Sequence, residues 1–209
     1  MKRWYYIILL AVLVLGCVYV YLHRYELGLV SPPSSGTDDS ASTDQSGSTA
    51  HPAHIVWQKV DRSTDGFTVE MPTDVKEIQI PAYNETGGSE QVNMIFATPD
   101  AETTYSVAWA DDPPVARYSD MSPDKTLDTA RDGALARTQT TLVSETKGQP
   151  QGFPDREFAS RNIGGGVMNS RLIYAGKRLY MLIAAFPSTS ARRDEDVNRF
   201  FNSLQILNK

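Results

Sequence analysis

The chain of 209 residues carries a formal net charge of −5 at pH 7, and this charge disfavours nucleic-acid binding as its function. Its single cysteine, Cys17, excludes a disulfide within the chain. All three histidines precede residue 55, so the remainder has no Ser-His-Asp triad, no Cys-His pair and no imidazole ligand for zinc.

The first predicted element is an unbroken run of 19 residues without a charged side chain, Trp4–Leu22. A helix of that length spans about 28 Å, close to the hydrocarbon thickness of a bilayer. Lys2 and Arg3 precede it, and the more positive flank stays in the cytoplasm. We predict a signal anchor: residues 1–3 form a cytoplasmic stub, residues 4–22 cross the cell membrane once, and the rest is extracytoplasmic.

Two kinds of cleaved signal are alternatives to this anchor. The segment Leu13–Cys17 resembles the lipobox of bacterial lipoproteins, in which the cysteine is lipidated and becomes the new N-terminus. The residues after Cys17 are still membrane-like, whereas a mature lipoprotein usually turns polar at once, so lipidation of Cys17 is the minor alternative. An ordinary signal peptide has a shorter apolar core and a small-residue cleavage site, which this chain lacks.

Residues 23–54 are predicted to form a disordered linker. Small and polar residues make up Ser31–His54, and such a segment cannot bury enough surface to offset the entropy of ordering. A flexible chain of this length reaches roughly 27 Å. His51 and His54 lie three residues apart, but no other ligands accompany them, so we interpret them as solvated linker residues rather than a metal site.

The segment 55–209 is long enough for one domain with its own core. Its first half alternates apolar and polar residues between Gly, Pro and Asp, which is typical of β-strands. The strands expected there are Ile55–Val60, Gly66–Pro72, Val75–Ile80 (ending at Pro81), Gln91–Ala97 and Thr103–Trp109.

The second half mixes helical and strand patterns. Ser122 and Pro123 are typical of a helix start, and the apolar spacing after them predicts an amphipathic helix over 124–140. Val197, Phe200, Phe201 and Leu204 form the stripe of a final helix. The strands expected here are Phe158–Ile163, Val167–Tyr174, Leu179–Phe186 and Gln205–Leu207, with a hairpin at Gly164–Gly166. The third, apolar on both faces, is expected at the centre of the sheet.

The predicted order of elements along the chain is strands, a helix, strands and a helix. This order favours the α+β class, with an antiparallel sheet and helices packed on it. Trp57 and several short segments carry a resemblance: Gly66–Pro72, Thr104–Asp111, Leu127–Gly133, Gly152–Phe158, Arg178–Tyr180 and Phe200–Leu204. Over residues 56–207 the chain resembles a bacterial family of membrane-anchored extracytoplasmic domains of unknown function, PsbP-like in fold. The resemblance implies a PsbP-like α/β sandwich and brings no catalytic residue. The family usually has glycine where this chain has Asp155, which implies a differently shaped turn.

Four arginines are the candidate binding residues: Arg156, Arg161, Arg171 and Arg178. They flank one predicted hairpin, and converging guanidinium groups would bind carboxylates or phosphates of a partner or an anion. Acidic residues dominate 55–112 and basic residues follow, so pairing between these two sets is the alternative. Asp111 and Asp112 lack the spacing of a calcium site, and we interpret them as a solvated loop.

These observations favour a membrane-tethered, non-catalytic binding or assembly module. Its expected partners are the membrane, through its own anchor, and envelope proteins; no metal or cofactor is expected. No phosphate-binding GxxxxGK[ST] or dinucleotide-binding GxGxxG motif occurs. The alternative is an enzyme that uses carboxylates on a cell-envelope substrate, because carboxylates are the catalytic groups that remain available.

Overall fold

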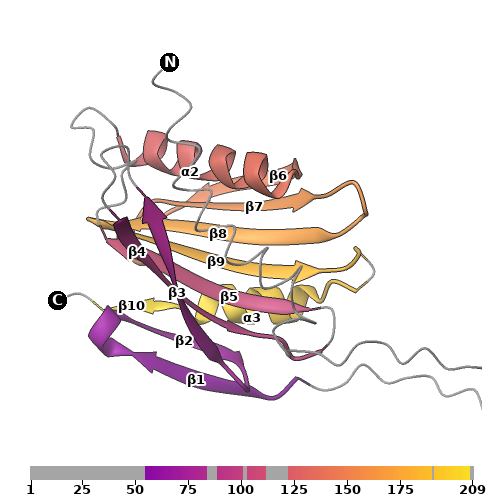
Figure 1. Ribbon diagram of the computed structural model, residues 1–209, viewed down its shortest axis with the longest axis horizontal. Coiled ribbons are helices and arrows are strands. Elements are labelled where there is room, and N and C mark those ends of the chain that lie inside the picture. The colour runs from indigo at the N-terminus through magenta and orange to yellow at the C-terminus, as the bar shows by residue number, and fades with distance from the viewer. Residues whose placement is uncertain (1–54, 84–88, 101–102, 112–121, 190, 208–209) are drawn as a thin grey trace, which may run out of the picture.

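The computed structural model describes residues 55–83, 89–100, 103–111, 122–189 and 191–207. The predicted anchor, Cys17 and the linker lie outside these residues. None of the helices within the described ranges is long and apolar enough to cross a membrane. The described part is built from two antiparallel sheets and two α-helices (Figure 1), which confirms the α+β class.

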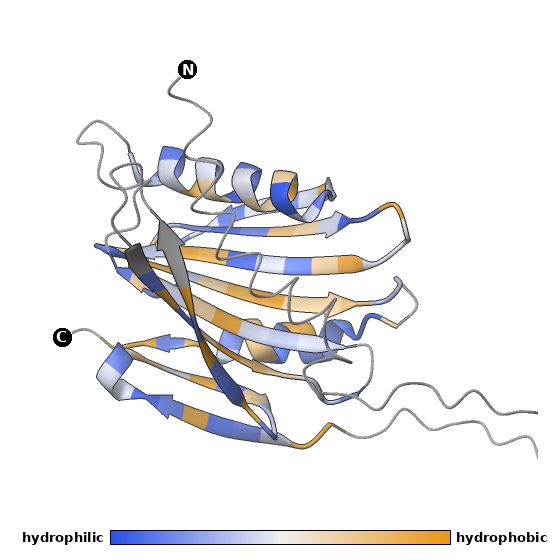
Figure 2. Ribbon diagram, viewed as in Figure 1, coloured by the Kyte–Doolittle hydropathy of each residue, from blue (hydrophilic) through white to orange (hydrophobic). Residues whose placement is uncertain are grey.

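The larger sheet has seven strands in the order β3-β4-β5-β9-β8-β7-β6, and every neighbouring pair is antiparallel. In chain order they are β3 (Lys76–Tyr83), β4 (Ser89–Ala97), β5 (Thr104–Asp111), β6 (Thr141–Gly148), β7 (Asp155–Arg161), β8 (Val167–Ala175) and β9 (Arg178–Phe186). The apolar strand β9 is the central one, as predicted. Figure 2 shows hydrophobic residues concentrated on the central strands.

The expectation of one sheet is wrong, because the first two strands and the last one form a separate sheet. Its order is β1 (Trp57–Arg62), β2 (Phe67–Pro72), β10 (Gln205–Ile206), also antiparallel. A short 3-10 helix, η1 (Ser63–Asp65), joins β1 to β2 and ends at Gly66, whose φ of 81° is readily adopted by glycine. β2 is buried on most of its length, so it packs face to face on the larger sheet.

Two further differences concern the edges of the larger sheet. β3 continues through Pro81 to Tyr83 instead of stopping there, because an edge strand has one side without a partner and tolerates a residue without an N–H. β6, the other edge, is a strand that the periodicity did not predict. Seven of its eight residues are exposed, so it lacks the alternation of a half-buried strand.

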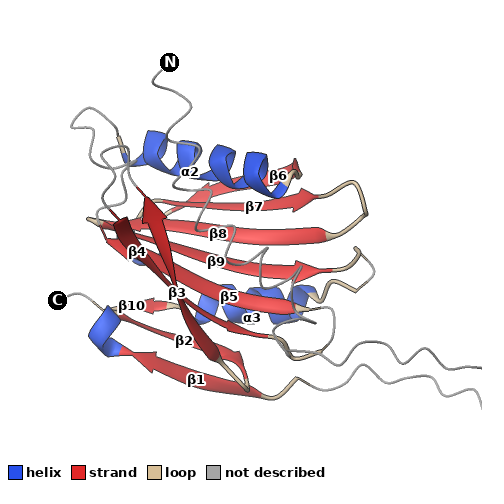
Figure 3. Ribbon diagram, in the orientation of Figure 1, coloured by secondary structure: helices blue, strands red, loops and turns tan. Residues whose placement is uncertain are grey.

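The helix α2 (Pro123–Thr138) covers one face of the larger sheet, over β7 and β8. The side chain of Ser122 accepts a hydrogen bond from the backbone N–H of Lys125, which confirms the predicted helix start. Leu127, Ala130 and Ala134 point into a first core that also contains side chains of β4, β5, β7, β8 and β9. Figure 3 shows this helix lying along the strands at the β6 end of the sheet.

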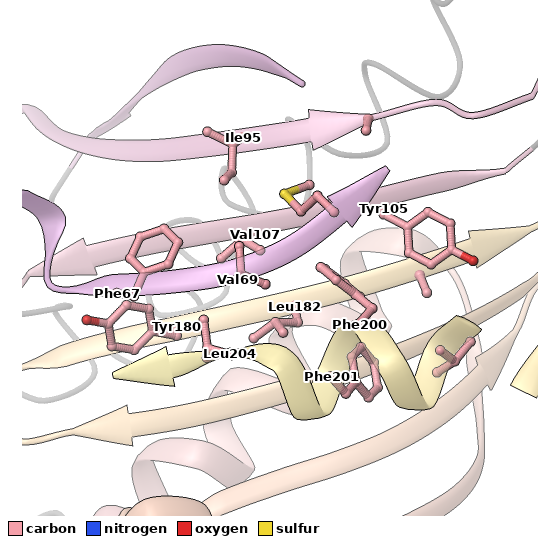
Figure 4. Close-up of a cluster of buried hydrophobic side chains, with 14 of the residues drawn as sticks. Phe67, Val69, Ile95, Tyr105, Val107, Tyr180, Leu182, Phe200, Phe201 and Leu204 are labelled. Carbon is pink, nitrogen blue, oxygen red and sulfur yellow. The ribbon is translucent and has the colours of Figure 1, made fainter. Parts of the chain in front are cut away.

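The other face carries the small sheet and the helix α3 (Asp194–Ser203). Val197, Phe200 and Phe201 are buried there, and Leu204 follows at 2% exposure, which confirms the predicted stripe. Figure 4 shows Phe200, Phe201 and Leu204 packed among residues of β2, β5 and β9. The two faces of the central strands therefore line two different cores, which explains why β9 is apolar from Leu179 to Phe186.

Candidate functional site

The four predicted arginines lie on β7, β8 and β9, but they do not form one surface. Arg156 pairs in register with Leu172, whose side chain belongs to the core under α2. Arg171 pairs with Glu157, one residue further along, and therefore points to the opposite face. Arg178 begins β9 next to Asp111, and Arg161 ends β7. Arg156 and Arg171 therefore lie on opposite faces of the sheet, whereas Arg161 and Arg178 lie at the ends of their strands.

Arg156 is buried, with 1% of its side chain exposed. Its Nε donates to Asp128 Oδ1 at 2.9 Å, its Nη2 to Asp124 Oδ1 at 2.6 Å, and its Nη1 to the carbonyl oxygen of Asp155 at 2.8 Å. Burial lowers the pKa of Arg156, but the hydrogen bonds to Asp124 and Asp128 outweigh burial and leave the pKa above its ordinary value. This geometry joins α2 to β7 and leaves the guanidinium inaccessible to a partner.

Arg171 joins the same strands to the other helix. Its Nε donates to Asp155 Oδ2 at 2.8 Å, and its Nη1 donates to the carbonyl oxygen of Phe201 at 3.2 Å, near the end of α3. Asp155 is itself buried, with 3% exposure. Asp155 is the residue predicted to replace a glycine of the resembling family. It is the first residue of β7, and its carboxylate binds Arg171.

Arg178 pairs across the strands with the acidic half of the domain. Its Nε and Nη2 donate to the two carboxylate oxygens of Asp111 at 2.5 and 2.7 Å, and its Nη1 donates to the carbonyl oxygen of Asp65. Arg199 and Arg193 likewise bind the earlier acidic residues Glu70 and Asp100, at 2.6 and 2.8 Å. Basic residues of the second half of the domain therefore pair with acidic residues of the first half. A binding role for the four arginines stays a prediction.

The Asp111–Arg178 pair predicts a pH-dependent contribution to stability. The hydrogen bond from Arg178 holds the pKa of Asp111 below its ordinary value. A lowered folded-state pKa stabilises the fold above the unfolded pKa of about 3.9, and that stabilisation is lost as pH falls through the folded-state pKa. Asp111→Asn should therefore lower stability at pH 7 by less than about 1 kcal/mol, since its carboxylate is largely exposed.

Urea unfolding of Asp111→Asn and the wild type at pH 7 and near pH 2 measures this contribution. The two curves should differ at pH 7, and the difference should shrink at the lower pH. Asp74→Asn is the matched control for the change of side chain, because none of the ion pairs among the described residues includes Asp74. A difference that persists in acid for Asp111→Asn would contradict the assignment.

The edge strand β6 is a feature that the arginine hypothesis missed. Leu142 and Val143 are 43% and 58% exposed, and a bulge displaces the register between Leu142 and Ser144. From Ser144 to Gly148 the pairing with β7 is regular. Glu145 alone in this strand is partly buried, held by Arg131 Nη1 at 2.6 Å. The signal in the sequence was the run Thr141–Val143, rich in β-branched residues, directly after the helix.

A strand of this kind is a candidate interaction site. It buries almost no side chain, and among the described strands only β7 forms backbone hydrogen bonds with it. Its outer side presents a row of backbone groups to which another strand can pair. The opposite edge of the sheet is protected by Pro81, which has no N–H to donate. Figure 1 shows β6 at the end of the sheet, next to α2.

No metal site was expected, and within the described ranges no group of three or more His, Cys, Asp or Glu residues is placed to hold a metal ion. Asp111, considered above for calcium, forms an ion pair with Arg178 instead of ending in a solvated loop. Asp112 lies outside the described residues.

Comparisons with known proteins give a similarity of fold. No family model matches the chain, and no curated protein matches it. The solution structure of cyanobacterial PsbP from Synechocystis sp. PCC 6803 is similar at 12% identity and a TM-score of 0.47, over 79% of this chain and 98% of that one. A crystal structure of a protein of unknown function from Pseudomonas aeruginosa is similar at 11% identity and a TM-score of 0.35, over 66% and 85%.

The likeness to PsbP concerns the fold alone, at the low identity given. Membership of the membrane-anchored bacterial family stays a prediction, as does the anchor itself.

Proposed function

We propose that this chain is a membrane-tethered, extracytoplasmic module that binds or assembles envelope proteins without catalysing a reaction, and that its binding surface is the open edge of β6. The observation that carries this proposal is an eight-residue strand that is regular over Ser144–Gly148 although seven of its residues are exposed. The uncharged run Trp4–Leu22 and the polar linker after it support the tether.

Strand addition is the binding mode that this edge favours. An added strand gains backbone hydrogen bonds along β6, and exposed side chains on the edge supply specificity. Leu142 and Val143 are the large apolar side chains that such a partner would cover. The arginines are less suited to this role, since Arg156, Arg171 and Arg178 already bind aspartates of the same domain.

A charge placed on the edge tests this function. The full chain, carrying an affinity tag, is cross-linked in its native membrane and purified as wild type, Val143→Lys and Ile163→Lys. Ile163 is the matched control, a fully exposed apolar residue in the β7–β8 hairpin. Val143→Lys should reduce the captured protein on the order of tenfold, which corresponds to about 1.4 kcal/mol of binding free energy. Ile163→Lys should retain it.

Equal capture by the three forms would show that β6 is not the binding surface. Turnover of a cell-envelope substrate by the full chain, abolished by one Asp or Glu substitution, would support the enzyme alternative instead. The intact mass of the same preparation tests the tether: a chain that keeps residues 1–16 is an anchored protein, and one that begins at a diacylated Cys17 is a lipoprotein.

A further inference from the structure

We propose that the partner strand at this edge is the β6 strand of a second copy of this chain, paired antiparallel about a two-fold axis at Thr146. The two seven-stranded sheets would then continue into one another. This inference rests on the proposed function and adds the identity of the partner. It follows from the order of side chains along the regular part of β6.

That part of the strand is complementary to itself in one antiparallel register. With Thr146 opposite the second copy's Thr146, Glu145 lies opposite Lys147, and Lys147 opposite Glu145. Opposite charges and threonine pairs directly across two strands are favourable contacts. Moving the axis by one residue, to Glu145 or Lys147, places identical charges opposite each other, which is unfavourable. Among the registers centred on Glu145, Thr146 and Lys147, the charges therefore favour Thr146.

The charges on this stretch are available for such pairing. Lys147 is exposed, and none of the ion pairs among the described residues includes it. Glu145 has 18% of its side chain exposed and already binds Arg131 Nη1 at 2.6 Å, so a lysine of the second copy would be a further cation for the same carboxylate. Both residues pair in register with Phe158 and Arg156 of β7, so they share one face of the sheet. A lysine from a second copy would approach Glu145 on that face.

The bulged end of β6 fits the same arrangement. In this register Leu142 and Val143 extend past the second copy's Gly148, toward its Gln149 and Pro150. Pro150 begins the short 3-10 helix η3 (Pro150–Gly152) and is partly exposed. Proline cannot continue the strand pairing, so the two strands pair over the regular residues and the exposed apolar side chains meet the proline ring.

The other open edges are less suited to a second copy. β3 contains Pro81, which interrupts any added ladder. β1 directs Trp57 and Val60 against the second core, so it has fewer side chains to offer a partner. A shared membrane would also hold two tethered copies at a high effective concentration, which favours a weak self-contact.

Cysteine cross-linking of the full chain in lipid vesicles tests the register. In a Cys17→Ser background, Thr146→Cys places two thiols on residues whose Cα atoms would lie about 4.5–5.5 Å apart, within disulfide range. Oxidation should convert most of this variant into a covalent dimer on non-reducing electrophoresis. Two controls should stay mostly monomeric: Thr141→Cys on the same strand but out of register, and Lys76→Cys on the opposite edge.

A charge change gives a second readout on the same chain. Adding Lys147→Glu to Thr146→Cys places glutamates opposite each other and should reduce the cross-linked dimer at least about fivefold. Lys147→Arg should preserve it. These residues are exposed, so circular dichroism should show the same fold in every variant.

Thr146→Cys that cross-links no more than Thr141→Cys or Lys76→Cys would overturn the two-fold pairing. So would equal cross-linking with Glu and Arg at position 147. If Val143→Lys still abolishes capture of a different envelope protein in that case, β6 remains a binding edge and only the identity of the partner is wrong. If Val143→Lys also leaves capture unchanged, the proposed function fails with it.

Discussion

Phe200→Ala is expected to lower the free energy of unfolding by about 3–5 kcal/mol. Phe200 is completely buried, and its ring packs edge-to-face on Tyr105 with centroids 5.4 Å apart. It also contacts Phe201, with centroids 5.7 Å apart. Truncation removes the transfer free energy of the ring and leaves a cavity between α3 and the larger sheet. Neighbouring strands pack against that space from both sheets, so it cannot collapse easily.

Chemical unfolding followed by the fluorescence of Trp57 and Trp109 measures this loss. Ile163→Ala is the matched control, because its side chain is fully exposed and its removal should change stability by at most about 0.5 kcal/mol. Phe200→Leu should lie between the two, since it keeps an apolar side chain of intermediate size. A loss below about 1 kcal/mol for Phe200→Ala would mean that α3 does not contribute to the core.

The periodic parts of this domain could be predicted from the sequence because each has a buried face. The apolar stripe of Val197, Phe200 and Phe201 predicted the last helix. The pair Ser122 and Pro123 predicted the start of α2. The apolar run in β9 predicted that this strand lies at the centre of the sheet. In each case the residues facing the core repeat with the period of the element.

The pairing of strands could not be predicted in the same way. β10 lies beside β2, so Ile206 pairs with Phe67 although more than half of the domain separates them in sequence. No local pattern encodes such a partner, and the division into two sheets follows from it. β6 was missed for another reason: an edge strand that is exposed on both faces has no alternation to detect.

The candidate site was harder to predict than the fold. Arginines near a hairpin suggested an anion site, but the sequence does not show which carboxylates lie opposite them. Asp111 and Arg178 are far apart in sequence and directly paired in the sheet. Charge composition therefore leaves open whether the arginines pair with carboxylates of the same domain or with a partner.

Arg156→Met is expected to lower the free energy of unfolding by about 3 kcal/mol, because it removes one member of a buried ion network. Methionine is similar in length, so the change tests the charge and the hydrogen bonds more than the packing. Loss of the guanidinium leaves the carbonyl oxygen of Asp155 without this donor, and leaves Glu145 with Arg131 as its remaining cation. Asp124 is largely exposed and can be rehydrated, which places the loss at the lower end of the usual 3–5 kcal/mol.

Two matched variants separate the contributions in the same unfolding experiment. Arg161→Met removes an exposed arginine that donates to Thr189 Oγ1 at 3.0 Å, and should cost at most about 0.5 kcal/mol. Arg156→Lys keeps the charge but cannot reach Asp124, Asp128 and the Asp155 carbonyl together, so its loss should be intermediate. If Arg156→Met and Arg161→Met were equally mild, the network under α2 would not hold the helix to β7.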